Sequence, residues 1–253
     1  MLHSTSKISY IHTAEIHNTN SAEEVLPYIF NLIKPASVID IGCGTGSWLK
    51  IAKQLGVKLI QGVDGIYLDR QLLSIENEEF KHHDLTLPLQ SNIKYDLAIC
   101  LEVAEHLPEA SADNLVDILT EHSAIVLFSA AVPGQGGQFH INEQWPDYWQ
   151  NKFASRGYFA FDTLRDIFWN NEKVEWWYRQ NMFIFSNLDL EQMLASKKES
   201  KPIRAHIHPD LFKKKVKDDL ENRQFIKNRI SNPQFTPTLR LLIKSIVKRK
   251  NNS

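Results

Sequence analysis

The sequence predicts an α/β protein in which helices cover both faces of a doubly wound, mostly parallel sheet. Short apolar, β-branched runs alternate with amphipathic stretches between residues 21 and 187, and this alternation is typical of βαβ units. The strand-like runs are almost continuously apolar, as expected for strands that are buried on both faces. Three of these runs end in an acidic residue, and three alternating glycines follow the first of them.

The elements can be assigned in order along the chain. A helix is expected over about 21–34, where Ser21 and Glu24 have the spacing of a capping box and Pro35 ends the helical pattern. Seven strands are expected at 38–41, 57–64, 80–84, 95–101, 124–129, 159–162 and 181–186, the last two as an antiparallel pair that closes the sheet. Further helices are expected at 48–55, 68–75, 111–122 and 146–156.

Three parts of the chain differ in composition. Residues 1–20 are polar and are expected to form an arm or a lid, residues 21–187 the α/β domain, and residues 188–253 a helical, basic C-terminal extension. The whole chain holds 29 Lys and Arg against 30 Asp and Glu, so its overall charge gives no reason to expect nucleic acid. The positive charge is concentrated near the C-terminus, where basic segments are usually solvated helices and sometimes contact phosphates or anionic lipid.

The segment 237–250 is a basic amphipathic stretch within that extension. Such a helix is a candidate for peripheral contact with an anionic membrane, although packing against the domain or a second subunit is the simpler expectation. No apolar run of about 18 residues is present to span a bilayer. Cys43 and Cys100 match no redox or ligand spacing and the N-terminus lacks the apolar core of a signal peptide, so we expect a cytoplasmic protein.

The glycine loop after the first strand indicates a nucleoside ligand. Its spacing is G-x-G-x-G rather than the G-x-G-x-x-G of dinucleotide sites, and Asp40 precedes it by two residues. An acid at this place suits a cationic amino group and would repel a pyrophosphate. Asp64 ends the second strand, where an acid binds ribose hydroxyls, and Asp84 ends the third strand, where it can accept from an adenine amine.

These motifs resemble those of the class I S-adenosylmethionine-dependent methyltransferases, over about residues 22–187. The resemblance implies a Rossmann-like, seven-stranded sheet and S-adenosylmethionine as cofactor. In that family the first acid and the glycines hold the methionine end, the second acid the ribose and the third the adenine. The implied cofactor-binding residues are Asp40, Gly42, Gly44, Gly46, Asp64, Asp84, Leu85 and Leu101.

A Glu-x-x-Glu-His motif follows the fourth strand, where the methyl group should meet its acceptor. On a helical turn, Glu102, Glu105 and His106 can converge. The same pattern occurs in ubiquinone-biosynthesis O-methyltransferases and in small-RNA 3′-terminal 2′-O-methyltransferases, and the RNA enzymes add a second histidine, for which His140 stands at a comparable place. The resemblance implies that Glu102, Glu105, His106 and His140 bind a divalent metal and that His106, Glu105 and His140 are catalytic.

Carboxylate and imidazole ligands suit Mg²⁺, Mn²⁺, Fe²⁺ or Zn²⁺ without selecting among them. The alternative is a metal-free site, in which the glutamate caps the following helix and His106 packs or acts as a base. Many members of the superfamily carry Glu-His-Leu at this point without a metal.

Five of the six tryptophans lie between residues 145 and 177, the region that usually forms the acceptor pocket. Residues 175–181 are both polar and aromatic, which favours a pocket or lid in which Arg179, Gln180 and Asn181 donate to hydroxyls. Trp145 and Trp149 have the spacing of one helix face and are more simply core residues.

These stretches resemble bacterial methyltransferases associated with surface-polysaccharide biosynthesis. The first expectation is therefore O-methylation of a sugar or glycan hydroxyl, and the second is another small hydroxylated metabolite. An RNA 2′-hydroxyl is the alternative acceptor, suggested by the Glu-x-x-Glu-His pattern and the basic tail. A non-catalytic, cofactor-binding scaffold is the second alternative, which the intact acidic and histidine motifs disfavour.

Overall fold

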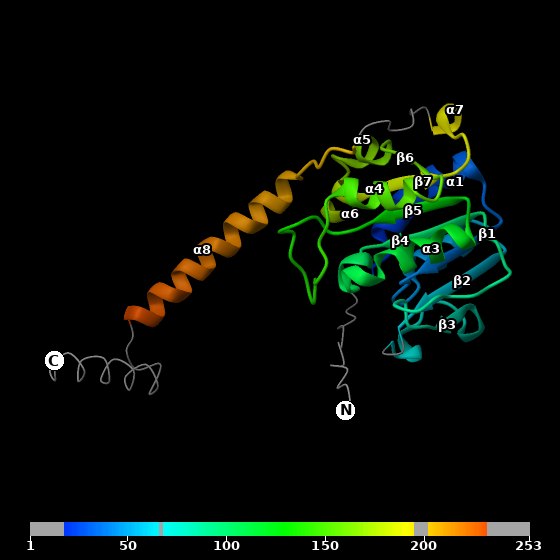
Figure 1. Ribbon diagram of the computed structural model, residues 1–253. Coiled ribbons are helices and arrows are strands. Elements are labelled where there is room, and N and C mark those ends of the chain that lie inside the picture. Colours follow the sequence, from blue (N-terminus) through cyan, green and yellow to red (C-terminus); the bar gives the residue numbers. More distant parts are fainter. Residues whose placement is uncertain (1–17, 66–67, 195–201, 232–253) are drawn as a thin grey trace. The chain divides into compact units, whose positions relative to one another are not determined.

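The structure is a computed structural model, which describes residues 18–65, 68–194 and 202–231 (Figure 1). Within them lies a seven-stranded sheet in the order β3-β2-β1-β4-β5-β7-β6. The strands are β1 Ser37–Ile41, β2 Leu59–Asp64, β3 Phe80–His82, β4 Leu97–Leu101, β5 Ile125–Ser129, β6 Phe159–Phe161 and β7 Phe183–Ser186. The predicted arm up to residue 17 and the amphipathic stretch 237–250 lie outside the described residues.

The sheet is mostly parallel, as predicted. Strands β1 to β5 pair in parallel, whereas β7 runs antiparallel to β5 and β6 antiparallel to β7. Because β1 lies between β2 and β4, the strand order reverses beside β1. In open α/β sheets, ligands bind at the carboxyl ends of the strands at such a reversal.

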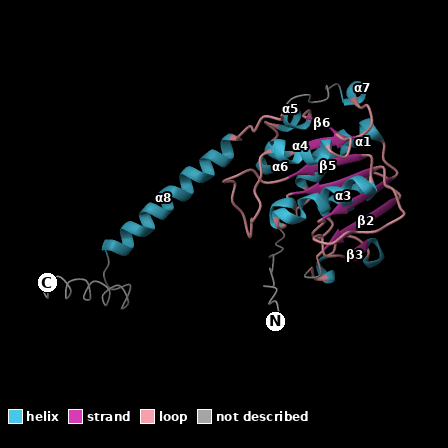
Figure 2. Cartoon of the chain, viewed as in Figure 1, coloured by secondary structure: helices cyan, strands magenta, loops and turns pink. Residues whose placement is uncertain are grey.

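Helices cover both faces of the sheet (Figures 1 and 2). The described helices of the sheet domain are α1 Asn20–Ile33, α2 Ser47–Gln54, α3 Ala112–His122, α4 Pro146–Ala154, α5 Leu164–Phe168, α6 Trp176–Asn181 and α7 Glu191–Leu194, whereas α8 Pro209–Ser231 belongs to a second unit. Side chains of α1, α2 and α5 share one core with Leu97 and Ile99 of β4, while those of α3 and α4 share another with Ala98 and Cys100. Alternate residues of one strand therefore enter opposite cores, which confirms the doubly wound fold.

Two local predictions are wrong. The expected helix at 68–75 contains only the 3₁₀ turn Arg70–Leu72. The capping box is also absent, because α1 begins one residue earlier than Ser21, with Thr19 at its N-cap and the Thr19 hydroxyl donating to Glu23 at 2.6 Å. The Ser21 hydroxyl instead accepts from the Glu175 amide at 3.0 Å, so it joins α1 to the start of α6.

The main domain extends beyond the predicted boundary at residue 187. The chain divides into two compact units, Met1–His208 and Pro209–Ser253. The second unit is described only as far as Ser231. Leu190, Leu194 and Ile203 are buried in the two cores of the first unit, because they cover apolar surface that the sheet domain would otherwise expose. The α8 helix of the second unit carries the ion pairs Asp210–Lys213 and Asp219–Arg223. No helix in the described part of the chain has the length and apolar character needed to cross a membrane.

Candidate functional site

The glycine loop leaves β1 at the carboxyl edge of the sheet. Gly42, Gly44 and Gly46 have φ angles of +82°, +52° and +79°, a region that glycine adopts without the strain that a Cβ causes. The Gly42 amide donates to the Val63 carbonyl at 2.7 Å. A Cβ at Gly42 would lie 2.3 Å from Cγ2 of Val103, so the loop must pass directly against the segment that follows β4.

Asp64 holds this loop against the end of β2. Its carboxylate accepts from the Gly44 amide and from the Gly65 amide, each at 2.6 Å. Asp40 lies in β1 and is buried, and burial, with a contribution from the Asp64 charge, raises the pKa of its carboxyl well above the usual value. The first and second predicted cofactor acids therefore lie together at the glycine loop.

The remaining predicted cofactor residues lie at the ends of neighbouring strands. Asp84 is exposed two residues beyond β3, where it accepts from the Thr86 amide and hydroxyl at 2.9 and 2.7 Å. Leu85 is buried, and its carbonyl accepts from the Asn114 side chain at 2.9 Å. Leu101 is the buried last residue of β4. The two hydrogen bonds from Thr86 both go to one carboxylate oxygen of Asp84. The contact of Asp84 with adenine stays a prediction.

A cluster of Glu105, His106 and His140 lies beyond the end of β4. One potential ligand atom from each residue lies within 4.8 Å of the others. Glu105 and His106 belong to the 3₁₀ turn Ala104–His106, and His140 comes from the glycine-rich loop after β5. The His106 and His140 rings meet edge to face with centroids 4.9 Å apart.

The backbone brings His140 to this turn. The amides of Ile141 and Asn142 both donate to the Glu105 carbonyl, at 2.9 and 3.0 Å. Glu143 then fixes the preceding part of the loop, because its carboxylate accepts from the Gly134 and Gly136 amides at 2.7 and 2.6 Å. The same carboxylate contacts Nδ1 of His140 at 2.9 Å.

Glu105 is fully buried, and neither of its carboxylate oxygens has a hydrogen-bond partner among the described residues. Burial, reinforced by the nearby Glu102 carboxylate, raises the pKa of Glu105 well above its usual value. Burial also lowers the pKa of His106 to about 4, and His140 adds to this effect. Near neutral pH the His106 imidazole is therefore uncharged and carries a lone pair, as a metal ligand or a base requires.

The cluster of three does not include Glu102, so the role of Glu102 as a fourth ligand stays a prediction. Glu102 has a positive φ of 53°, and its carboxylate accepts from Gln135 at 2.8 Å and from Asn181 at 3.1 Å. This left-handed conformation departs from a regular helical turn, yet the Glu102 carboxyl still lies close enough to Glu105 to raise the pKa of that residue. Glu102 joins the end of β4 to the loop after β5 and to α6.

The Trp-rich region has a mixed role. Trp149 is buried against Phe128, with ring centroids 5.3 Å apart, whereas Trp145 is 44% exposed. Gln180 and Asn181 are buried and their amides bond to each other at 3.0 Å, and their expected donation to an acceptor stays a prediction. Gln135 and Glu143 were not predicted as site residues, although the His140-x-x-Glu143 spacing is a signal in the sequence for Glu143.

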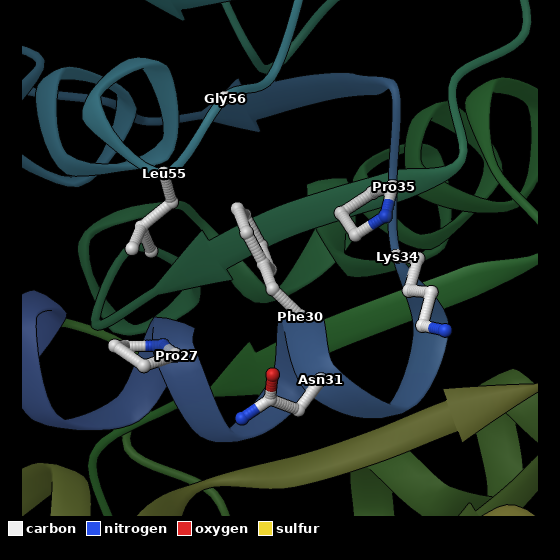
Figure 3. A pocket seen from close by; sticks show the side chains of 7 residues that line it. All are labelled: Pro27, Phe30, Asn31, Lys34, Pro35, Leu55 and Gly56. Carbon is white, nitrogen blue, oxygen red and sulfur yellow. The ribbon is translucent and has the colours of Figure 1, made fainter.

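A cavity of ≈ 310 Å³ lies elsewhere, between the ends of α1 and α2. Figure 3 shows Phe30 extending between Leu55 and Pro35 in this cavity. Its remaining lining residues are Pro27, Asn31, Lys34 and Gly56. Lys34 and Pro35 precede β1, so the cavity lies at the amino edge of the sheet, opposite the edge that carries the glycine loop and the histidine cluster.

Comparison with known proteins agrees with this fold. Residues 14–196 match the family model described as a methyltransferase domain, and the chain belongs to this family. The protein is a class I S-adenosylmethionine-dependent methyltransferase. No curated protein matched the chain.

Two solved structures share the fold. CalS10, an amino pentose methyltransferase from Micromonospora echinaspora solved with S-adenosylmethionine bound, has a TM-score of 0.52 at 14% identity, covering 71% of this chain and 98% of its own. DesVI from Streptomyces venezuelae has a TM-score of 0.50 at 11% identity, covering 67% of this chain and 92% of its own.

Proposed function

We propose that this methyltransferase is an O-methyltransferase that acts on a hydroxyl of a sugar, a glycan or another small hydroxylated metabolite. The observation that carries the proposal is the convergence of Glu105, His106 and His140, whose potential ligand atoms lie within 4.8 Å of one another. This cluster follows β4, next to the glycine loop. A methyl donor over the loop would meet its acceptor there.

Methyl transfer requires an acceptor oxygen in line with the methyl carbon. The oxygen forms a bond to that carbon while the carbon–sulfur bond breaks, and S-adenosylhomocysteine leaves with the electron pair. Holding the two reactants in this line is a large part of the catalysis. The hydroxyl proton must also be removed, and the neutral imidazole of His106, whose pKa is lowered to about 4, is available to accept it or to pass it to solvent.

The three residues also fit a divalent cation. Glu105 offers two buried carboxylate oxygens that no described group bonds, and an acid left in this state is costly unless it is protonated or binds a cation. One carboxylate and two imidazoles form a donor set that Zn²⁺, Fe²⁺ and Mn²⁺ accept. A metal bound there would lower the pKa of a coordinated hydroxyl.

The charges of the side chains around the cluster favour a small acceptor over RNA. The described cluster consists of the Glu105 carboxylate and the imidazoles of His106 and His140, with the Glu143 carboxylate beside them. These groups form no cationic surface for the sugar–phosphate backbone of RNA. The fold accommodates sugar acceptors, since CalS10 is an amino pentose methyltransferase. The resemblance to polysaccharide-associated enzymes makes a glycan hydroxyl the first candidate.

The test is methyl transfer from radiolabelled S-adenosylmethionine to a panel of methyl glycosides, with the methylated atom identified by mass spectrometry and NMR. We expect transfer to oxygen, loss of most activity after EDTA dialysis, and recovery with Mn²⁺ or Zn²⁺. His106→Gln and His140→Gln should lower kcat by about 10²-fold or more, whereas His206→Gln, which changes an exposed histidine, should not. Transfer to nitrogen only would contradict O-methylation, and full turnover in EDTA would contradict the metal.

RNA is the second candidate acceptor, favoured by the basic residues beyond position 211. Binding of a single-stranded RNA oligonucleotide should then weaken steeply with salt, because each neutralised phosphate releases counterions. Transfer to the RNA 2′-hydroxyl and no transfer to any glycoside would replace the first candidate with this one.

A further inference from the structure

We propose that Glu143 is a positioning residue that sets the orientation and the tautomer of His140. The inference rests on the proposed function in one respect, because it takes His140 as a ligand or base in the cluster with Glu105 and His106. Its evidence is separate, since it comes from the hydrogen bonds within the loop after β5 and from the space around the His140 ring.

Three donors converge on the Glu143 carboxylate. One oxygen contacts both Nδ1 of His140 at 2.9 Å and the Gly136 amide at 2.6 Å, and the other contacts the Gly134 amide at 2.7 Å. An exposed ion pair contributes little to stability, because both side chains must lose their freedom to form it. Here the two backbone amides hold the carboxylate, and the side chains of His140 and Glu143 are only 11% and 18% exposed. The carboxylate is therefore a fixed acceptor for the imidazole.

This arrangement selects one tautomer of His140. Each oxygen of the Glu143 carboxylate already accepts a hydrogen bond from a backbone amide, that of Gly134 or of Gly136. A carboxylate held by two backbone N–H donors acts as an acceptor toward the ring as well, so Nδ1 of His140 carries the proton. A neutral His140 then has its lone pair on Nε2. Carboxylates that orient metal-binding histidines through the second ring nitrogen act in this way in many metal sites.

Gly137 packs closely against the His140 ring. A Cβ at Gly137 would lie 2.2 Å from Nε2, 2.5 Å from Cε1 and 2.8 Å from Cδ2 of His140. Any larger residue would displace the imidazole. The ring also meets His106 edge to face, and the amides of Ile141 and Asn142 donate to the Glu105 carbonyl. Glu143, Gly137 and the Glu105 carbonyl thus fix His140 from three directions.

The experiment uses the full-length protein and two independent readouts. The first is the tautomer of His140 in metal-free protein, measured by ¹⁵N NMR of the histidine rings and assigned by comparison with His140→Gln. The second is the affinity for Mn²⁺ and Zn²⁺, measured by calorimetry. The variants are Glu143→Gln, which keeps the shape but offers only one oxygen to three donors, and Gly137→Ala, which moves the ring and leaves Glu143 intact. Glu172→Gln, at an exposed glutamate in the main domain, is the matched control.

We expect the Nδ1–H tautomer in the unaltered protein and its loss in Glu143→Gln. Metal affinity should fall about 10- to 100-fold in that variant, and it should also fall in Gly137→Ala. Affinity for S-adenosylmethionine should stay within about twofold, as a measure of intact folding, and Glu172→Gln should match the unaltered protein in every readout.

The outcomes separate this inference from the proposed function. An Nε2–H tautomer in the unaltered protein would overturn the role of Glu143, and this result requires no variant to fold. Unchanged tautomer and metal affinity in Glu143→Gln would overturn it as well. Absence of any divalent-metal binding by the unaltered protein would instead contradict the metal in the proposed function, while the tautomer would still decide the role of Glu143.

Discussion

Gly42 meets two separate constraints at the residue scale. Its φ of +82° lies in the left-handed region, which costs an L-residue about 1–2 kcal/mol. Its missing side chain also leaves room for Val103, to which a Cβ would approach within 2.3 Å. Gly157 shares the first constraint, with φ of +77°, but a Cβ there would meet nothing within 4 Å. A comparison of substitutions at Gly42 and Gly157 therefore distinguishes the cost of backbone strain from the cost of a steric clash with Val103.

We predict that Gly42→Ala lowers the free energy of unfolding by about 3 kcal/mol, the sum of strain and overpacking. Gly157→Ala should cost only about 1 kcal/mol. Gly42→Ala should also weaken S-adenosylmethionine binding at least about tenfold, because the loop must move away from β4. Urea unfolding and calorimetry test this pair, and equal behaviour of the two variants would refute the role of Val103.

His106 gives a pH-dependent prediction at the same scale. Burial lowers its pKa to about 4 from a usual value of 6.5, so the unfolded chain binds a proton between these values while the folded protein does not. The free energy of unfolding must therefore fall as the pH drops through this window. Between pH 7 and pH 5, metal-free protein should lose about 2 kcal/mol more stability than His106→Gln. Parallel urea titrations at the two pH values measure this, and equal losses would show that His106 is not buried in its neutral form.

At the scale of elements, the site depends on contacts among three segments that are distant in sequence. The end of β4 supplies Glu102, the loop after β5 supplies Gln135, and the end of α6 supplies Asn181. Asn181 donates to both of the others, at 3.1 and 2.9 Å. The Glu102 amide in turn donates to the Ser129 carbonyl at 3.0 Å, which fixes it beside the end of β5. This network supports the turn that carries Glu105 and His106.

Asn181→Ala should lower the free energy of unfolding by about 2 kcal/mol, because the buried Glu102 carboxylate loses a donor. Asn187→Ala, at an exposed position just beyond β7, is the control and should change stability by less than about 0.5 kcal/mol. Chemical denaturation measures both variants. If Asn181→Ala lowered the free energy of unfolding no more than the control does, the hydrogen bond from Gln135 would be sufficient to hold the Glu102 carboxylate.

At the scale of the whole molecule, residues 188–208 belong with the sheet domain. Leu190, Leu194 and Ile203 are 3%, 2% and 5% exposed, and the His208 amide donates to Gln180 at 2.8 Å. These contacts lie within the first compact unit, Met1–His208. The polar, basic composition that suggested an extension from residue 188 therefore conceals a short apolar segment that completes both cores.

A chain of residues 1–208 should unfold cooperatively and bind S-adenosylmethionine within about twofold of the full-length affinity. A chain of residues 1–187 should lose several kcal/mol, since each of three apolar side chains contributes about 1.5–3 kcal/mol when buried. Thermal unfolding followed by circular dichroism, with calorimetric cofactor titration, tests both. Equal stability of the two truncated chains would return the boundary to residue 187.

The elements that were predicted correctly are those whose signal is local. The periodicity of α1 and α3 and the continuous apolar runs of β1, β4 and β5 depend only on neighbouring residues and on burial. Two short elements were not predicted: α6 lies in the segment expected to form a pocket or lid, where the Trp-rich sequence lacks a clear apolar face, and the segment 68–75, expected to be a helix, holds only the 3₁₀ turn Arg70–Leu72. In such short segments, tertiary contacts outweigh the intrinsic preference of the residues.

The sequence by itself determined the class of fold, the glycine loop and the acids at the strand ends, because alternation, glycine spacing and strand termini are all encoded within a few residues. It also identified Glu105, His106 and His140. Only the tertiary structure decided that Glu102 accepts hydrogen bonds from Gln135 and Asn181, and that Glu143 faces His140. The physical reason is that a carboxylate bonds whichever donors the fold brings to it, and these donors come from segments 33 and 79 residues away in the case of Glu102.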